Sequence, residues 1–256
     1  MEFLATIEKS FKTYLQTGAR SNEKLKILHA KIAQDFSAKL GDNFNIYALG
    51  INEGIEKTIT GHYYEKKVDI SIFKNNTPQA GIAVKFIMSN YGQNANNYFE
   101  GMLGETANIR TQKIPYFQII IVPEQMPYFD ENGNITKIEH FKTHHLEKYI
   151  ALSKDKQFLH APNKTLLALI KLPDFSTAND KDSYERLCNN GAVTYSNKFS
   201  TEQFGENVIL NNYTDFLNQA CCEILGGINV AKVCAGFKGI FIIITQNLKK
   251  IFVIRP

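Results

Sequence analysis

Two short segments of this chain carry residues that could do metal-assisted chemistry on a β-sheet. Residues 68–73 and 81–86 read VDISIF and GIAVKF, and turn-forming residues separate them. Folded as a hairpin about Thr77, these strands would place Asp69 opposite Lys85 on one face, with apolar side chains on the other face. A carboxylate beside an ammonium group can hold a divalent cation and a water next to a phosphate. The pair therefore predicts phosphodiester hydrolysis.

Several residues could complete such a centre. Asp69 offers the hard oxygen ligands that Mg²⁺ prefers, and the backbone carbonyl of Val84 offers a further one. Lys85 would orient the attacking water or screen the phosphate. The following helix offers Glu100 and Glu105, which fall at opposite edges of its apolar stripe. We favour Glu100 as the second acid, because it sits nearer the end of the Lys85 strand.

The Asp69 strand, followed by Ala83-Val84-Lys85, resembles the PD-(D/E)xK nuclease superfamily, especially its type II restriction endonucleases. The usual pattern has an acid two residues before the lysine, where this chain has Ala83. Some members carry that acid on the next helix instead, and Glu100 lies fifteen residues after Lys85. The resemblance covers residues 44–123.

This resemblance implies a Mg²⁺-dependent endonuclease that cuts double-stranded DNA at a specific sequence. It implies a mixed sheet flanked by helices and a homodimer with one active site for each strand. Glu53 or Glu56 could serve as an accessory acid, which many members have in that region. Two alternatives stay open: a repair or recombination nuclease of the same superfamily, and a nucleic-acid-binding protein that has lost catalysis together with the acid at Ala83.

A polar segment after the Lys85 strand offers DNA contacts. Amides can pair with adenine edges and tyrosines can pack on sugars; the residues are Asn90, Tyr91, Gln93, Asn94, Asn96 and Asn97. Lys66, Lys67 and Arg110 flank the predicted site and could contact phosphates. A solvated loop with ordinary surface charges explains the same residues equally well. His140 and His144 are spaced to share a helix face, but no third metal ligand accompanies them, and we interpret them as surface histidines.

Composition limits the class of protein to which this chain can belong. The chain has 256 residues, 44% of them apolar, and a net charge of +4, which indicates a folded protein compatible with a polyanionic partner. We expect one α/β domain over residues 1–256, cytoplasmic, without a signal peptide or a membrane span. Cys221 and Cys222 are expected in an apolar helix as reduced thiols.

The expected elements follow from hydrophobic periodicity. Helices are expected at residues 4–15, 21–40, 97–111, 138–153 and 216–225, the last with a possible extension through 230–235. Strands are expected at 43–49, 55–64, 115–123 and 164–172, with a terminal hairpin at 238–254. Residues 174–199 are expected to be irregular.

Overall fold

The computed structural model describes residues 2–51, 54–155 and 157–226. The expected helix extension at 230–235, the hairpin at 238–254 and the possible accessory acid Glu53 all lie outside these residues.

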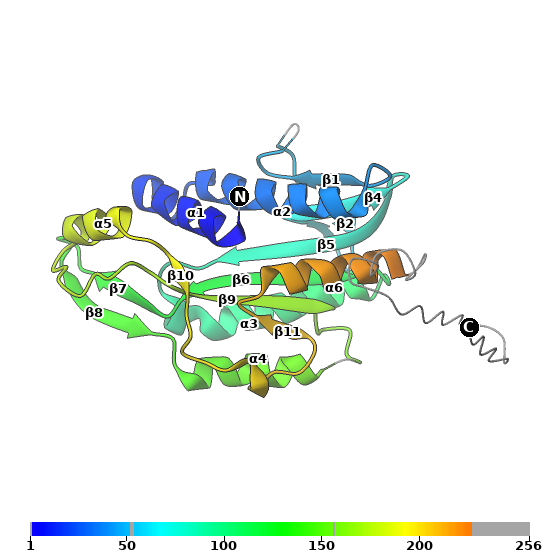
Figure 1. Ribbon diagram of the computed structural model, residues 1–256. Coiled ribbons are helices and arrows are strands. Elements are labelled where there is room, and N and C mark those ends of the chain that lie inside the picture. The colour runs from blue at the N-terminus through cyan, green and yellow to red at the C-terminus, as the bar shows by residue number, and fades with distance from the viewer. Residues whose placement is uncertain (1, 52–53, 156, 227–256) are drawn as a thin grey trace, which may run out of the picture.

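A seven-stranded mixed sheet forms the centre of the molecule, in the order β1-β4-β5-β6-β9-β10, with β11 also paired to β9 (Figure 1). Strands β5, β6, β9 and β11 run parallel to one another, whereas β1, β4 and β10 pair antiparallel with their neighbours. The strands are β1 Asn45–Ala48, β4 Ile70–Lys74, β5 Thr77–Phe86, β6 Tyr116–Pro123, β9 Lys164–Lys171, β10 Thr194–Tyr195 and β11 Val208–Leu210. The expected α/β architecture with a mixed sheet is confirmed.

Helices cover both faces of this sheet (Figure 1). The helices α1, α2, α5 and α6 pack on one face, and α3 and α4 pack on the other. Their bounds are α1 Phe3–Thr17, α2 Glu23–Leu40, α3 Tyr91–Arg110, α4 Thr143–Lys154, α5 Lys181–Asn190 and α6 Tyr213–Gly226. A short 3₁₀ turn spans Thr201–Gln203. None of the described helices combines the length and apolar character needed to cross a bilayer.

Long apolar patterns were predicted well. The first two helices and strand β9 match the expected ranges closely, and all eight residues of β6 are buried, as its continuous apolar run between prolines predicts. Helix α6 contains Cys221 and Cys222, as expected.

Polar stretches were predicted poorly. Helix α3 begins at Tyr91 instead of residue 97, because the Tyr91 ring is buried while Asn90 adopts the left-handed conformation that starts the helix. Residues 174–199 contain α5, whose N-cap Asp180 accepts a hydrogen bond from the Ser183 amide in a capping box.

Two small hairpins stand apart from the central sheet. Strand β2, Thr58–Thr60, pairs with β3, Glu65–Lys67, so the single strand expected at 55–64 is wrong and its last residues form a turn. Strand β7, Gln125–Phe129, pairs with β8, Ile135–His140. Since His140 ends a strand, it does not share a helix face with His144, and that expectation is also wrong.

The register of the central hairpin differs from the expected one by two residues. Strands β4 and β5 turn at Asn75 and Asn76, both at positive φ (50° and 59°), which forms a two-residue connection. Ile70 pairs with Ile82, and continuing this register places Asp69 beside Ala83 instead of Lys85. A shift of two residues keeps the same side chains on each face of the sheet but moves their partners.

Candidate functional site

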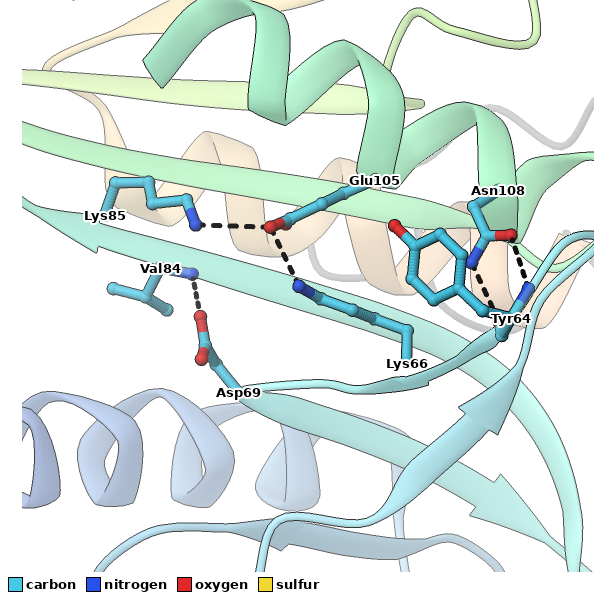
Figure 2. A network of polar contacts seen from close by, with 7 residues as sticks. All are labelled: Tyr64, Lys66, Asp69, Val84, Lys85, Glu105 and Asn108. Atoms are coloured by element: carbon cyan, nitrogen blue, oxygen red, sulfur yellow. Dashed lines mark hydrogen bonds and ion pairs between the residues drawn. The ribbon is translucent and has the colours of Figure 1, made fainter. Parts of the chain in front are cut away.

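Asp69 lies where β4 leaves the sheet. Its Oδ2 atom accepts a hydrogen bond from the Val84 amide at 2.7 Å (Figure 2). The carboxylate therefore takes the place of the backbone carbonyl that would accept this bond if β4 continued. The amide and carbonyl of one strand residue point to the same side, so the Val84 carbonyl also faces the Asp69 side of β5. Figure 2 shows the carboxylate on the side of β5 that faces away from α3.

Two further ligand-type side chains meet Asp69 at this edge. His29 comes from α2, and Glu56 comes from the segment between β1 and β2. One potential ligand atom from each of the three residues lies within 4.8 Å of the others. The Nδ1 atom of His29 is 4.0 Å from the Oε1 atom of Glu56, which is too long for a hydrogen bond and leaves room between them. We call His29, Glu56 and Asp69 the metal-ligand group.

Without a cation, the surroundings of the metal-ligand group are energetically unfavourable for its polar side chains. The His29 imidazole is fully buried, and neither ring nitrogen has a hydrogen-bond partner among the described residues. Burial lowers the pKa of His29, against the opposing effect of Asp69, so the imidazole is neutral and offers a lone pair at neutral pH. Burial and then the charge of Asp69 raise the pKa of Glu56, although Lys67 Nζ lies 3.5 Å from Glu56 Oε2 and acts in the opposite direction.

A second charged group lies on the α3 side of β5. The carboxylate of Glu105 receives Lys66 Nζ at 2.9 Å and Lys85 Nζ at 3.5 Å on the same Oε1 atom (Figure 2). We call Glu105, Lys66 and Lys85 the lysine-pair group. Burial works against the charged form of Lys66, but Glu105, and more weakly Asp69, raise its pKa on balance.

Tyr116 couples the two groups electrostatically. Its ring is fully buried on β6. Burial is the main reason that the pKa of Tyr116 is well above its ordinary value, and the charges of Glu105 and Asp69 raise it further. Both carboxylates therefore act electrostatically on one buried hydroxyl.

The expectation that Glu100 reaches this region is wrong. Glu100 is exposed and interacts electrostatically with Lys148 of α4, whereas Glu105 contacts Lys85. Five residues of α-helix turn a side chain by about 140°, so the two glutamates point in different directions. Because β5 and β6 are parallel, α3 must run back along β5, and its second half reaches the Asp69 end.

His29 is the residue that the sequence analysis missed. The sequence feature that could have identified it is its position in the apolar stripe of α2, three residues before Ile32 and seven before Phe36. A histidine at that position must be buried. The sequence predicts at most an accessory acid at Glu56, and the structure places a carboxylate oxygen of Glu56 within 4.8 Å of ligand atoms of Asp69 and His29.

The residues predicted to contact DNA fall into different environments. Tyr91 is buried, packs on Phe141 at a centroid distance of 5.2 Å and lies 3.3 Å from the Tyr149 hydroxyl, so a DNA-contacting role is wrong for it. The exposed residues of this segment are Asn90, Gln93, Asn96 and Asn97, while Asn94 is half-buried and bonded to the Asn90 carbonyl.

The amides of this segment lie in the first turns of α3, and Glu105 follows Asn94 by roughly 16 Å along the helix axis. The Arg110 guanidinium donates to the carbonyls of Phe158 and Ala161, which ties it to the fold. The Lys67 side chain is 64% exposed and open to an anionic ligand.

No family model, curated protein or solved structure matches this chain. Function is therefore inferred from the geometry of the site and from the resemblance of its short motif.

Proposed function

We propose that this protein is a divalent-metal-dependent nuclease that hydrolyses phosphodiester bonds in double-stranded DNA. The observation that carries the proposal is the convergence of His29, Glu56 and Asp69, whose ligand atoms lie within 4.8 Å of one another. Three separate chain segments supply these side chains, so their meeting is a property of the fold and not of local sequence.

The residues present fit a metal ion. A buried imidazole with two unpartnered nitrogens next to two carboxylates is an unfavourable arrangement by itself, and a cation would satisfy both the lone pair and the negative charge. His29, Glu56 and Asp69 would hold the ion, with the Val84 carbonyl as a further candidate. Bound there, the ion would supply Lewis acidity and a water of lowered pKa. Mg²⁺ and Mn²⁺ both suit such a set, and the imidazole favours Mn²⁺.

The chain's own residues would position the substrate. The Val84 amide fixes the Asp69 carboxylate, so this ligand is held in place before any ion or phosphate arrives. Lys67 is exposed beside Glu56 and would draw a phosphate toward the metal-ligand group. In the lysine-pair group, two ammonium groups share one carboxylate, which leaves a net positive charge for a phosphate oxygen. Lys85 would donate to that oxygen or orient the attacking water.

DNA is proposed as the polymer because Asp69 and Ala83-Val84-Lys85 resemble the nuclease motif and because the chain carries a net charge of +4. More specifically, we propose that a homodimer cleaves the DNA at a specific sequence, as type II restriction endonucleases do.

One observation favours a different function, a nucleic-acid-binding protein without catalysis. Ala83 stands where the usual motif has an acid, and its side chain is buried against Ile109 and Tyr116. Because Ala83 offers no carboxylate, the second metal-binding acid must come from Glu56 or the site is inactive.

Incubation of the protein with supercoiled plasmid or phage DNA separates these functions. With Mg²⁺ or Mn²⁺ we expect cleavage, which EDTA abolishes. Discrete fragments indicate sequence-specific cutting, and a smear indicates a nonspecific nuclease. Asp69→Asn should remove cleavage and spare DNA binding, while Asp42→Asn, an exposed aspartate distant in sequence, should behave as wild type. Intact DNA under all conditions, with DNA binding retained, would support the non-catalytic alternative.

A further inference from the structure

The turn between β2 and β3 presents aromatic rings to solvent. Tyr63 is 80% exposed and Tyr64 is 53% exposed, which makes them two of the most exposed large apolar side chains among the described residues. The His62 ring packs edge-on against Tyr63, with their centroids 4.6 Å apart. We call His62, Tyr63 and Tyr64 the aromatic tip. Adjacent exposed rings on one rigid turn are a common feature of binding surfaces.

The backbone of the aromatic tip is fixed from below by a buried amide. Asn108 of α3 is 2% exposed, and its Oδ1 atom accepts the Tyr63 amide at 2.8 Å, while its Nδ2 atom donates to the Tyr64 carbonyl at 3.0 Å. The Asn108 carbonyl also accepts the His62 amide at 2.8 Å. Gly61 is required for this approach, because a Cβ atom there would lie 2.1 Å from Asn108 Nδ2. The fold therefore uses a buried side chain to fix the backbone that carries two exposed rings.

The aromatic tip is continuous with the candidate site. Lys66 and Lys67 follow Tyr64 in the same hairpin and contact Glu105 and Glu56, which belong to the two charged groups. The extended chain from Tyr64 to Lys67 spans about 10 Å, a distance of a few nucleotides. Figure 2 shows Tyr64 between Asn108 and the lysine-pair group. Residues 57–67 contain three lysines and one glutamate, so the surroundings favour an anionic ligand.

From these observations we propose that the aromatic tip is a stacking platform for an unpaired nucleic-acid base next to the phosphate to be cleaved. Aromatic rings that are rigid, exposed and surrounded by lysines bind single-stranded nucleic acid by base stacking. A base within a closed duplex has both faces covered by its neighbours and cannot stack on Tyr63. The inference rests on the proposed nuclease function and narrows its substrate to DNA with an unpaired, frayed or flipped nucleotide near the scissile bond.

Equilibrium binding in EDTA tests this platform separately from catalysis. Fluorescence anisotropy would compare a labelled oligothymidylate with a blunt duplex of equal length. We expect Tyr63→Ala to weaken binding of the single strand by about 5- to 150-fold, the size of one base–ring stacking contact. Tyr63→Phe should retain binding, because the ring and not the hydroxyl carries the contact. Phe129→Ala, which removes an exposed ring from the distant β7–β8 hairpin, should have no effect.

Three outcomes would overturn the platform: unchanged single-strand binding by Tyr63→Ala, an equal loss for the single strand and the duplex, or loss of self-association in Tyr63→Ala during sedimentation. The last result would identify the tip as an interface between copies of this chain. Thermal unfolding of both Tyr63 variants should match wild type, because Tyr63 is 80% exposed. EDTA prevents cleavage, so binding and cutting are measured separately. If single-strand binding depends on Tyr63 but no metal-dependent cutting is found, the nuclease is refuted and the platform stands. If metal-dependent cutting is found but single-strand binding does not depend on Tyr63, only the platform is refuted.

Discussion

The metal-ligand group and the lysine-pair group differ in how well their charges are satisfied. In the lysine-pair group, Glu105 lies between Lys66 and Lys85, and every member has an ionic partner. In the metal-ligand group, two carboxylates stand beside a neutral imidazole that has no hydrogen bond among the described residues, and their charge is offset by Lys67 beside Glu56 and more weakly by Lys66. Both groups border β5, so the contrast does not come from different parts of the fold.

This difference indicates separate tasks. A group whose carboxylate already has two ammonium partners gains little from a metal ion, since that carboxylate would have to give up both partners. A group with crowded carboxylates and an unpartnered imidazole gains from any cation that enters. We therefore propose that His29, Glu56 and Asp69 bind the cation and that Lys66 and Lys85 orient the substrate. Four variants test this proposal.

Asp69→Asn should break the metal-ligand group completely. Loss of one carboxylate ligand should lower the affinity for Mn²⁺ by more than about 100-fold, since changes outside the ligand shell alone cost about 10- to 100-fold. Metal-dependent cleavage should fall to background. Plasmid cleavage and calorimetric titration with Mn²⁺ measure the two effects. Wild-type cleavage by this variant would show that the metal lies elsewhere.

Lys85→Ala should lower turnover without changing metal binding. Removing one ammonium that orients water or stabilises a developing charge costs on the order of 100-fold in kcat. The affinity for Mn²⁺ should equal that of wild type, because Lys85 belongs to the other group. Lys171→Ala, at the exposed end of β9, is the matched control. If Lys85→Ala cleaves DNA at the wild-type rate, the lysine-pair group is structural.

His29→Asn should change which metal the protein prefers. Imidazole nitrogen binds first-row transition metals better than it binds Mg²⁺, so the affinity for Mn²⁺ should fall by about 10- to 100-fold and that for Mg²⁺ should fall less. Because His29 is fully buried, thermal unfolding without metal must accompany the titrations. Equal losses for both ions would show that His29 is not a ligand.

Glu105→Gln should have the smallest effect. The contacts to Lys66 and Lys85 are partly solvated, with side-chain exposures of 16% to 30%, so the free energy of unfolding should fall by about 1 kcal/mol. Urea unfolding measures this change, and Glu100→Gln on the exposed face of the same helix is the control. Metal affinity should remain unchanged. A large loss of Mn²⁺ binding in Glu105→Gln would show that the two groups form a single metal centre and do not have separate roles.

The sequence was sufficient for the parts of the fold that hydrophobic pattern determines. The continuous apolar run of β6 and the 3.6-residue stripe of α2 each allow only one element type at that length. It also identified strands β4 and β5, whose face assignment depends on alternation, which a two-residue error in register does not disturb. Alternation does not extend to Asp69, which lies just before β4, so the predicted meeting of Asp69 and Lys85 on one face is wrong.

The composition of the site was harder to predict because it depends on long-range geometry. The register depends on the turn at Asn75 and Asn76, and a two-residue turn could not be distinguished from a longer one by composition. The choice between Glu100 and Glu105 required the direction and axial rotation of α3 relative to β5. His29 lies forty residues before Asp69 in the sequence, and only packing of α2 against the sheet brings them together.

The most direct test of this account is an isothermal titration of Mn²⁺ into the metal-free protein at neutral pH. We predict one saturable site per chain that is lost in Asp69→Asn and weakened in His29→Asn, but retained in Glu105→Gln. Absence of any saturable binding, or binding that all three variants keep unchanged, would contradict the assignment of His29, Glu56 and Asp69 as ligands.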